Sequence, residues 1–134
     1  TILNFMTIYA LSSGPGIAGV AVVRVSGEDT SKVIKLITGK DLPVPRVATL
    51  RKMNNINTNE LTDEGLIIWF PGPESYTGED LAEFHIHGSH AVVRALHSSI
   101  SEIDNCVISI SEIFLILYLS IKFFLSYNLK CFQK

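Results

Sequence analysis

The pattern of hydrophobic and polar positions predicts five β-strands. Residues 65–70 are a continuous apolar run, which indicates a strand buried on both faces. The other four strands alternate between apolar and polar positions or are rich in β-branched residues, and they are predicted at residues 6–11, 19–25, 47–53 (the weakest) and 81–87. The polar residues 54–63 are predicted to form a loop.

Two segments have the periodicity of amphipathic helices. The first follows Ser26, the predicted N-cap because Asp29 comes three residues later, and it ends at Gly39. Its apolar face consists of Val33, Ile34 and Ile37. The second follows Ser89, and its apolar face consists of Val92, Leu96, Ile100 and Ile103. The order β-β-α-β-β-β-α predicts an α/β or α+β domain with a mixed sheet and flanking helices.

The chain changes character near residue 105. Every glycine, proline, histidine and tryptophan lies before that position, and the apolar residues 105–134 contribute much of the mean hydropathy of +0.32. We favour a tail that did not evolve with the domain, such as a frameshifted end, over a helix or strand pair of the domain. A membrane segment at residues 114–125 is least favoured, because Glu112 and Lys122 bracket only nine residues and a span needs roughly 20.

Length and composition limit the possible functions. The 134 residues suffice for one domain, expected at residues 6–104, and the net charge of −2 does not support a nucleic-acid surface built on bulk positive charge. Cys106 and Cys131 have neither zinc-site spacing nor partners for a disulfide framework.

Met6 is the expected natural start, with residues 1–5 derived from upstream sequence or a vector. No secretory signal or transit peptide is recognisable.

Two glycine motifs resemble nucleotide-binding loops but lack the required context. Residues 14–19 fit Gly-x-Gly-x-x-Gly, but a predicted strand follows where the dinucleotide fingerprint needs a helix. Gly39-Lys40 could end a phosphate-binding loop only with glycine at position 34 and serine or threonine at 41, where the chain has Ile34 and Asp41. We therefore expect no hydrolysis of GTP or ATP by this chain.

The strand predicted at residues 81–87 carries a candidate metal site. Glu83, His85 and His87 would share one face of it, because side chains alternate along a strand. Such a set could hold a divalent metal, but catalytic zinc sites rarely draw all their ligands from one strand and no further ligand cluster is apparent. A polar face that is solvated or lines a ligand site is therefore favoured over a metal.

Arg24 and the loop at residues 71–80 are the candidate binding features. Arg24 is a lone charge in an apolar strand, and its guanidinium needs either an internal carboxylate or an anionic or carbonyl-bearing ligand. Two prolines and two glycines constrain the loop, which presents Tyr76, Thr77, Glu79 and Asp80. This composition indicates a binding loop on a rigid scaffold, with an elaborate turn as the alternative.

Several blocks of sequence occur together in a specific order. Trp-Phe-Pro-Gly-Pro-Glu-Ser-Tyr-Thr-Gly-Glu-Asp occupies residues 69–80, and Glu-Phe-His-Ile-His-Gly occupies residues 83–88. Before them come Thr-Ile-Tyr-Ala-Leu at 7–11, Gly-Pro-Gly at 14–16, Val-Ala-Val-Val-Arg-Val-Ser-Gly at 20–27 and Leu-Pro-Val-Pro-Arg at 42–46. Over residues 7–104 the chain thus resembles the N-terminal domain of the MnmE (TrmE) family of tRNA-modifying GTPases.

The resemblance implies a fold similar to the folate-binding domain of the glycine-cleavage T protein, and homodimerisation through this domain. It also implies binding of 5-formyl- or 5,10-methylene-tetrahydrofolate as a one-carbon donor. Arg24 and Glu83 match folate-contacting positions, while Tyr76, Thr77 and Glu79 would shape the pocket mouth. In the family, the whole protein works with MnmG (GidA), which carries FAD, to modify carbon 5 of the tRNA wobble uridine. The bacterial cytoplasm is the favoured location, with the mitochondrial matrix as the alternative.

The chain also departs from the family pattern. Ser89 stands where the family usually has a second glycine. After residue 104, the family's proline-glycine-glutamate-phenylalanine segment and a lysine that helps to hold folate do not appear. The GTPase domain, with its GTP, Mg²⁺ and K⁺, is also outside this sequence. Because the net charge of −2 does not support a nucleic-acid surface, no direct contact with nucleic acid is expected from this chain. The alternatives are a remnant that folds but binds no folate and a membrane-tethered fragment.

Overall fold

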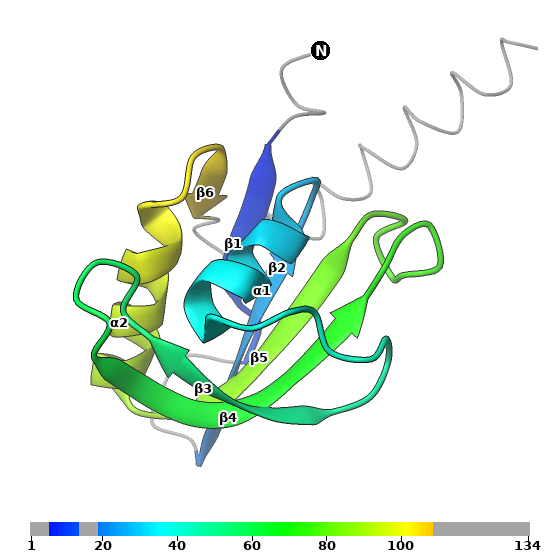
Figure 1. Cartoon of the computed structure of the whole chain (residues 1–134). Helices are drawn as coiled ribbons and strands as arrows, with labels where there is room; N and C mark the ends of the chain where they lie inside the picture. The colour runs from blue at the N-terminus through cyan, green and yellow to red at the C-terminus, as the bar shows by residue number, and fades with distance from the viewer. Residues whose placement is uncertain (1–5, 14–18, 109–134) are drawn as a thin grey trace, which may run out of the picture.

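The computed structural model describes residues 6–13 and 19–108, which form one sheet with two helices packed on one face (Figure 1). The strands are β1 (Thr7–Leu11), β2 (Val20–Ser26), β3 (Thr49–Asn54), β4 (Leu61–Phe70), β5 (Leu81–His87) and β6 (Cys106–Ile108), and the helices are α1 (Thr30–Thr38) and α2 (His90–Ser101). The six strands are ordered β3-β4-β5-β2-β1-β6, and among them only β1 and β6 pair in parallel. The predicted α+β class with a mixed sheet is confirmed.

The hydrophobic core lies between the sheet and the two helices. The sheet contributes alternate side chains of its central strands, chiefly Ala21, Val23, Val25, Ile67, Trp69, Ala82, Phe84 and Ile86. The helices contribute Val33, Ile34, Ile37, Leu96 and Ile100. Gly39 ends α1 in the left-handed conformation, and Ser89 caps α2 by accepting a hydrogen bond from the Val92 backbone. Both helix faces, the Gly39 stop and the Ser89 cap are therefore confirmed.

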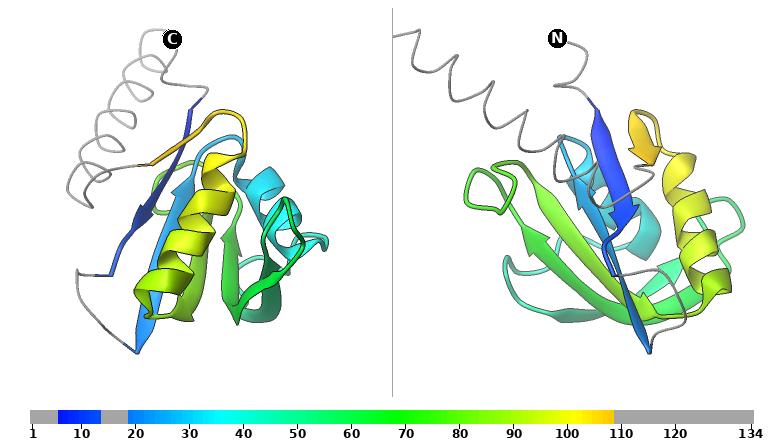
Figure 2. Two further views of the ribbon diagram at one scale, coloured as in Figure 1. Left: turned by 90° about the vertical axis from the view of Figure 1, so that its left-hand side faces the viewer. Right: turned by 180° about the vertical axis from the view of Figure 1, so that it is seen from behind.

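The other side chains of the central strands lie on the opposite face of the sheet, which we call the site face. It carries Val22, Arg24 and Ser26 of β2, Leu66 and Ile68 of β4, and Leu81, Glu83 and His85 of β5. The turned views show the twisted sheet with α2 running along one side of it (Figure 2). Because neighbouring strands pair in register, polar residues far apart in the sequence become cross-strand neighbours on this face.

The start of α1 differs from the prediction. Ser26 is the last residue of β2, so its predicted capping box with Asp29 is wrong. Asp29 takes the N-cap position without a side-chain cap hydrogen bond, and its backbone N–H donates to Thr7 Oγ1 at 2.8 Å. Thr30 Oγ1 donates to the Gly27 carbonyl at 2.8 Å. These contacts begin the helix without Ser26, whose side chain remains on the site face.

The β3–β4 hairpin also differs from the prediction. β3 begins at Thr49, and β4 already begins at Leu61, so part of the predicted loop is strand. Between them, Asn55 Oδ1 accepts hydrogen bonds from the next backbone N–H groups and turns the chain. Leu66 of β4 is 41% exposed, so the predicted burial on both faces is wrong. The reason is that the described helices cover only one face of the sheet.

The sheet continues past residue 104, the predicted end of the domain. β6 pairs with β1, and the Thr7 N–H donates to the Asn105 carbonyl at 2.9 Å. Residues 109–134, with the candidate membrane segment at 114–125, lie outside the described residues. Within residues 6–13 and 19–108, no helix is long and apolar enough to cross a membrane. The foreign origin of the tail therefore stays a prediction.

Gly65 of β4 approaches β5 so closely that a side chain does not fit. A Cβ atom at this position would lie 2.1 Å from the His85 carbonyl oxygen. We expect Gly65→Ala to lower the free energy of unfolding, measured in urea, by about 1–3 kcal/mol, the usual effect of overpacking. Gly19→Ala is the matched control, because a Cβ there meets no atom of the described residues within 4 Å. Parent-like stability of Gly65→Ala would contradict the close pairing of β4 with β5.

Candidate functional site

Arg24 and Glu83 form an ion pair on the site face. They are register partners in β2 and β5, and Arg24 Nε donates to Glu83 Oε2 at 3.2 Å. The sequence allowed either an internal carboxylate or a ligand as the partner of Arg24, and the Glu83 carboxylate is present as an internal partner. The Arg24 side chain is 39% exposed and the Glu83 side chain 17%. A pair this exposed stabilises the fold by only about 0–1 kcal/mol, so a ligand could displace one partner with little loss of stability.

Glu83 has a second oxygen that is available on this face. Its Oε1 accepts no hydrogen bond from the described residues, and His85 Nε2, at 3.9 Å, is too far to donate one. His85 Nε2 is itself enclosed and has no hydrogen-bond partner in the described part of the chain. An enclosed polar atom without a partner is unfavourable. The enclosed His85 Nε2 and the adjacent Glu83 Oε1, which accepts no hydrogen bond from the described residues, indicate a position for a polar group of a ligand.

The loop at residues 71–80 connects β4 to β5 and is held at its ends by Asp80. The Gly72 N–H donates to Asp80 Oδ1 at 2.8 Å, while the Asp80 carbonyl accepts from the Gly27 N–H at 2.9 Å. Within the loop, Gly78 has a φ of 74°, a backbone conformation that favours glycine. The loop is therefore fixed beside the end of β2, as a binding loop on a rigid scaffold would be.

A hydroxyl cluster joins this loop to the site face. Ser26 Oγ lies 2.9 Å from Thr77 Oγ1 and donates to Glu79 Oε2 at 3.1 Å. Ser26 and Thr77 are both buried. Because Ser26 lies two positions after Arg24 on one face of β2, the cluster brings Thr77 and Glu79 to the same face as Arg24. Ser26 was not predicted as a site residue. Because side chains alternate along a strand, its position two residues after Arg24 could have indicated that it lies on the same face.

Tyr76 lies apart from this cluster, with 80% of its surface exposed. Two residues earlier in the loop, Glu74 contacts Arg46. The Arg46 guanidinium donates a hydrogen bond to the Glu74 carbonyl and lies 3.8 Å from the Glu74 carboxylate. The structure thus brings together Arg24 with Glu83, and Thr77 with Glu79. It does not bring Tyr76 to either pair, and a role of Tyr76 at the pocket mouth stays a prediction.

His87, the third member of the candidate metal set, is engaged elsewhere. Its Nδ1 lies 2.8 Å from Asp63 Oδ1, and its backbone N–H donates to Asp63 Oδ2 at 2.8 Å. Burial alone would raise the pKa of Asp63, but the hydrogen bonds from His87 and the Glu64 backbone, with the charge of His87, lower it below its ordinary value. Among the described residues, no group of three or more His, Cys, Asp or Glu side chains could hold a metal ion.

Comparisons with known proteins agree on one family. Residues 7–109 match the family model described as the N-terminus of the GTP-binding protein TrmE. The chain is 75% identical over 101 residues to the tRNA modification GTPase MnmE of Pelagibacter ubique, covering 75% of this chain and 23% of that protein. It is 56% identical over 87 residues to the mitochondrial 5-taurinomethyluridine-[tRNA] synthase subunit GTPB3 of Danio rerio, covering 65% and 17%. The chain thus spans less than a quarter of the length of these relatives.

The hydroxyl cluster gives a direct test of how the loop is held. Ser26→Ala removes both contacts of Ser26 and leaves the buried Thr77 hydroxyl without that partner. We expect the free energy of unfolding in urea to fall by about 1–3 kcal/mol, because an enclosed hydroxyl loses its hydrogen bond. Ser98→Ala, at an exposed position of α2, is the control and should cause no loss. If the two variants are equally stable, Ser26 does not anchor the loop.

Proposed function

Because the chain belongs to the family of TrmE N-terminal domains, we propose that it binds a reduced folate on the site face. The observation that carries the proposal is the Arg24–Glu83 pair, with one Glu83 oxygen and the neighbouring His85 Nε2 both without hydrogen-bond partners among the described residues. The loop anchored by Ser26, Thr77 and Glu79 borders the same face. Together these residues supply a polar floor and a fixed wall for a flat, polar ring.

The chemistry of a pterin suits these residues. A pterin presents adjacent N–H donors along one edge, and a carboxylate can accept both in bidentate fashion. Glu83 fits this role, since one of its oxygens is unoccupied and the other is engaged only by the weakly stabilising pair with Arg24. Arg24 would then meet a carbonyl or carboxylate oxygen of 5-formyl- or 5,10-methylene-tetrahydrofolate with its fork of donors. His85 Nε2 is placed to make one further hydrogen bond.

Within the longer protein, the bound folate would supply a one-carbon unit for modification of tRNA. The relatives are named as a tRNA modification GTPase and as a subunit of a tRNA-modifying synthase, which supports this assignment. In the proposed arrangement, carbon 5 of the wobble uridine receives the unit, and the FAD-carrying partner MnmG acts with the whole protein. The described residues would contribute folate binding, while GTP binding comes from other parts of the protein.

We further propose that a second copy of the chain packs against the site face. Leu50 of β3 and Leu66 of β4 are register partners and are 60% and 41% exposed. Leu66 is in turn the register partner of His85, so this apolar pair borders the proposed folate site. Adjacent exposed leucines on a sheet favour burial against another protein surface. Folate binding and dimerisation would then use neighbouring parts of one face.

Folate binding is tested by calorimetry with 5-formyltetrahydrofolate. We expect the parent chain to bind, and Arg24→Ala and Glu83→Gln each to raise the Kd by about tenfold or more, because each removes a charge-assisted hydrogen bond. Arg94→Ala, on the exposed surface of α2, is the control and should bind like the parent. No heat at millimolar ligand would favour the alternative that the chain folds but binds no folate. Tight binding by Arg24→Ala and Glu83→Gln would disprove the assigned site.

Dimerisation is tested by sedimentation equilibrium. We expect the parent to be dimeric and Leu66→Lys to be monomeric, because a lysine at this position would place a charge in the apolar interface. Leu36→Lys on α1 is the matched control, since Leu36 is 46% exposed on the helical side of the molecule. A monomeric parent, or an equal effect of the two substitutions, would contradict dimerisation through the site face.

A further inference from the structure

A pocket of about 650 Å³ opens on the helical side of the sheet, away from the site face. It lies between the end of α1, the connector that follows and β3, and it is lined by Lys35, Gly39, Lys40, Asp41, Leu42 and Arg51. Arg51 is on the helical side because it lies two positions before Met53, which is buried in the core. The pocket is therefore separate from Arg24 and Glu83.

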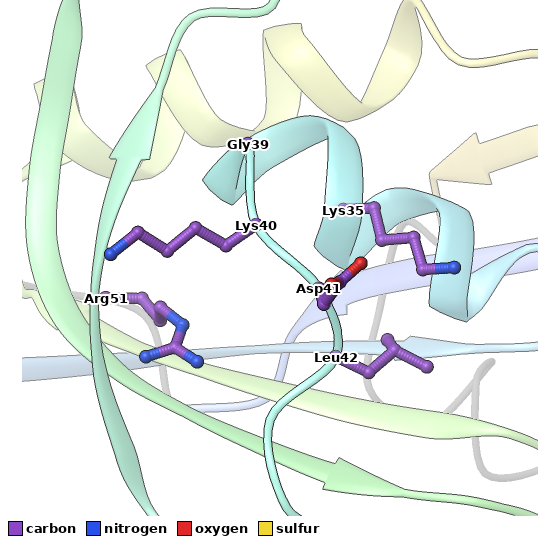
Figure 3. A pocket seen from close by; sticks show the side chains of 6 residues that line it. All are labelled: Lys35, Gly39, Lys40, Asp41, Leu42 and Arg51. Carbon is purple, nitrogen blue, oxygen red and sulfur yellow. The ribbon is translucent and has the colours of Figure 1, made fainter.

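The charge around this pocket is positive. Three cationic side chains and one carboxylate line it, and none of the three cations forms an ion pair within the described part of the chain. Figure 3 shows the side chains of Lys40 and Arg51 in the same gap between the connector and β3, while Asp41 lies beside the connector and Lys35 points the other way. Two cationic side chains that share one gap attract an anion.

Arg51 supplies a second observation. Its Nε is enclosed and has no hydrogen-bond partner among the described residues. One of its two outer nitrogens, Nη1, donates to the Leu50 carbonyl at 3.4 Å. An enclosed donor without a partner is unfavourable, and charged donors more so. An oxygen of a bound anion would satisfy this donor, and a guanidinium can give a phosphate two parallel hydrogen bonds.

The end of α1 partly accommodates an anion. The carbonyl end of a helix normally repels negative charge. Here the Ile34 carbonyl accepts a hydrogen bond from Thr38 Oγ1 at 2.7 Å, and the Lys35 carbonyl accepts one from the Gly39 N–H at 2.8 Å. Both carbonyls are therefore satisfied, and Lys35 and Lys40 outweigh the charge of Asp41.

We propose that this pocket binds a phosphate group between Lys40 and Arg51, with Lys35 adding positive charge at longer range. A phosphate matches the pocket better than a carboxylate, because it carries up to two charges and can accept hydrogen bonds from both side chains at once. The phosphate can belong to a free anion or to the backbone of RNA, since the chemistry of the group is the same. The proposal does not depend on folate binding.

The Nε–H resonance of Arg51 in nitrogen-15 NMR spectra of the full chain reports on this site. The chain is titrated at constant ionic strength with inorganic phosphate in one arm and with a short single-stranded RNA in the other. We expect a saturable shift of this resonance. A shift that saturates with phosphate alone, with RNA alone or with both supports the proposal. The arm in which the shift saturates identifies whether the pocket takes a free phosphate or a phosphate of the RNA backbone. No saturable shift in either arm overturns it.

Matched substitutions separate this pocket from general charge effects. Lys40→Gln and Arg51→Gln should each weaken binding by about tenfold, the effect of one charge-assisted hydrogen bond. Binding by Arg51→Gln is followed by calorimetry, because this variant lacks the Arg51 Nε–H resonance. Binding by Lys40→Gln is followed by that resonance, which this variant retains. Lys52→Gln is the control, because Lys52 is the exposed neighbour of Arg51 on β3 and points to the other face. Equal weakening by Lys52→Gln would overturn the proposal, because the effect would then be non-specific.

Discussion

The antiparallel pairing of β2 with β5 runs through the middle of the sheet, and both the core and the candidate site depend on its register. Side chains alternate along each strand, so the register that places Val23 beside Phe84 toward the helices also places Arg24 beside Glu83 on the site face. A slip of one residue would move the charged pair into the core and expose the apolar pair. Because Val23 and Phe84 are completely buried, hydrophobic packing determines the placement of the charged side chains.

The end of β2 links this register to the binding loop. Gly27 follows β2 with a φ of 140°, and a Cβ there would lie 2.7 Å from the Thr7 Cα, so β1 and the turn into α1 are in close contact. The Asp80 carbonyl accepts hydrogen bonds from the Gly27 N–H and from Thr30 Oγ1, and these bonds tie the loop to the same turn. The loop, the start of α1 and the charged pair on the site face therefore form one connected structure.

Much of this fold could be predicted from local patterns, and the contacts of the site could not. Alternation in β5 correctly assigned Phe84 to the core and Glu83 to the other face, because the period of a strand is local information. The contact of Glu83 with Arg24 joins residues that are 59 positions apart, and it depends on a register that neither strand encodes alone. The family resemblance identified Arg24 and Glu83 as folate-contacting positions, but it did not indicate that the two side chains contact each other.

The wrong predictions have physical reasons of the same kind. Ser26 has the spacing of a helix cap with Asp29, but its contacts with the loop are long-range and were not visible in the sequence. β6 is a three-residue strand that follows the change in composition, so it was not distinguished from the apolar tail. Leu66 lies in a continuous apolar run, and only the one-sided position of the described helices leaves it exposed.

We place the pterin at the Arg24–Glu83 pair on the site face. The most direct measurement is a crystal structure of the chain grown with 5-formyltetrahydrofolate. We expect the pterin ring on the site face, with its N–H edge within hydrogen-bond distance of the Glu83 carboxylate and with His85 Nε2 hydrogen-bonded to the ligand. A ligand bound on the helical side, or on the site face without contact to Glu83 and Arg24, would contradict it.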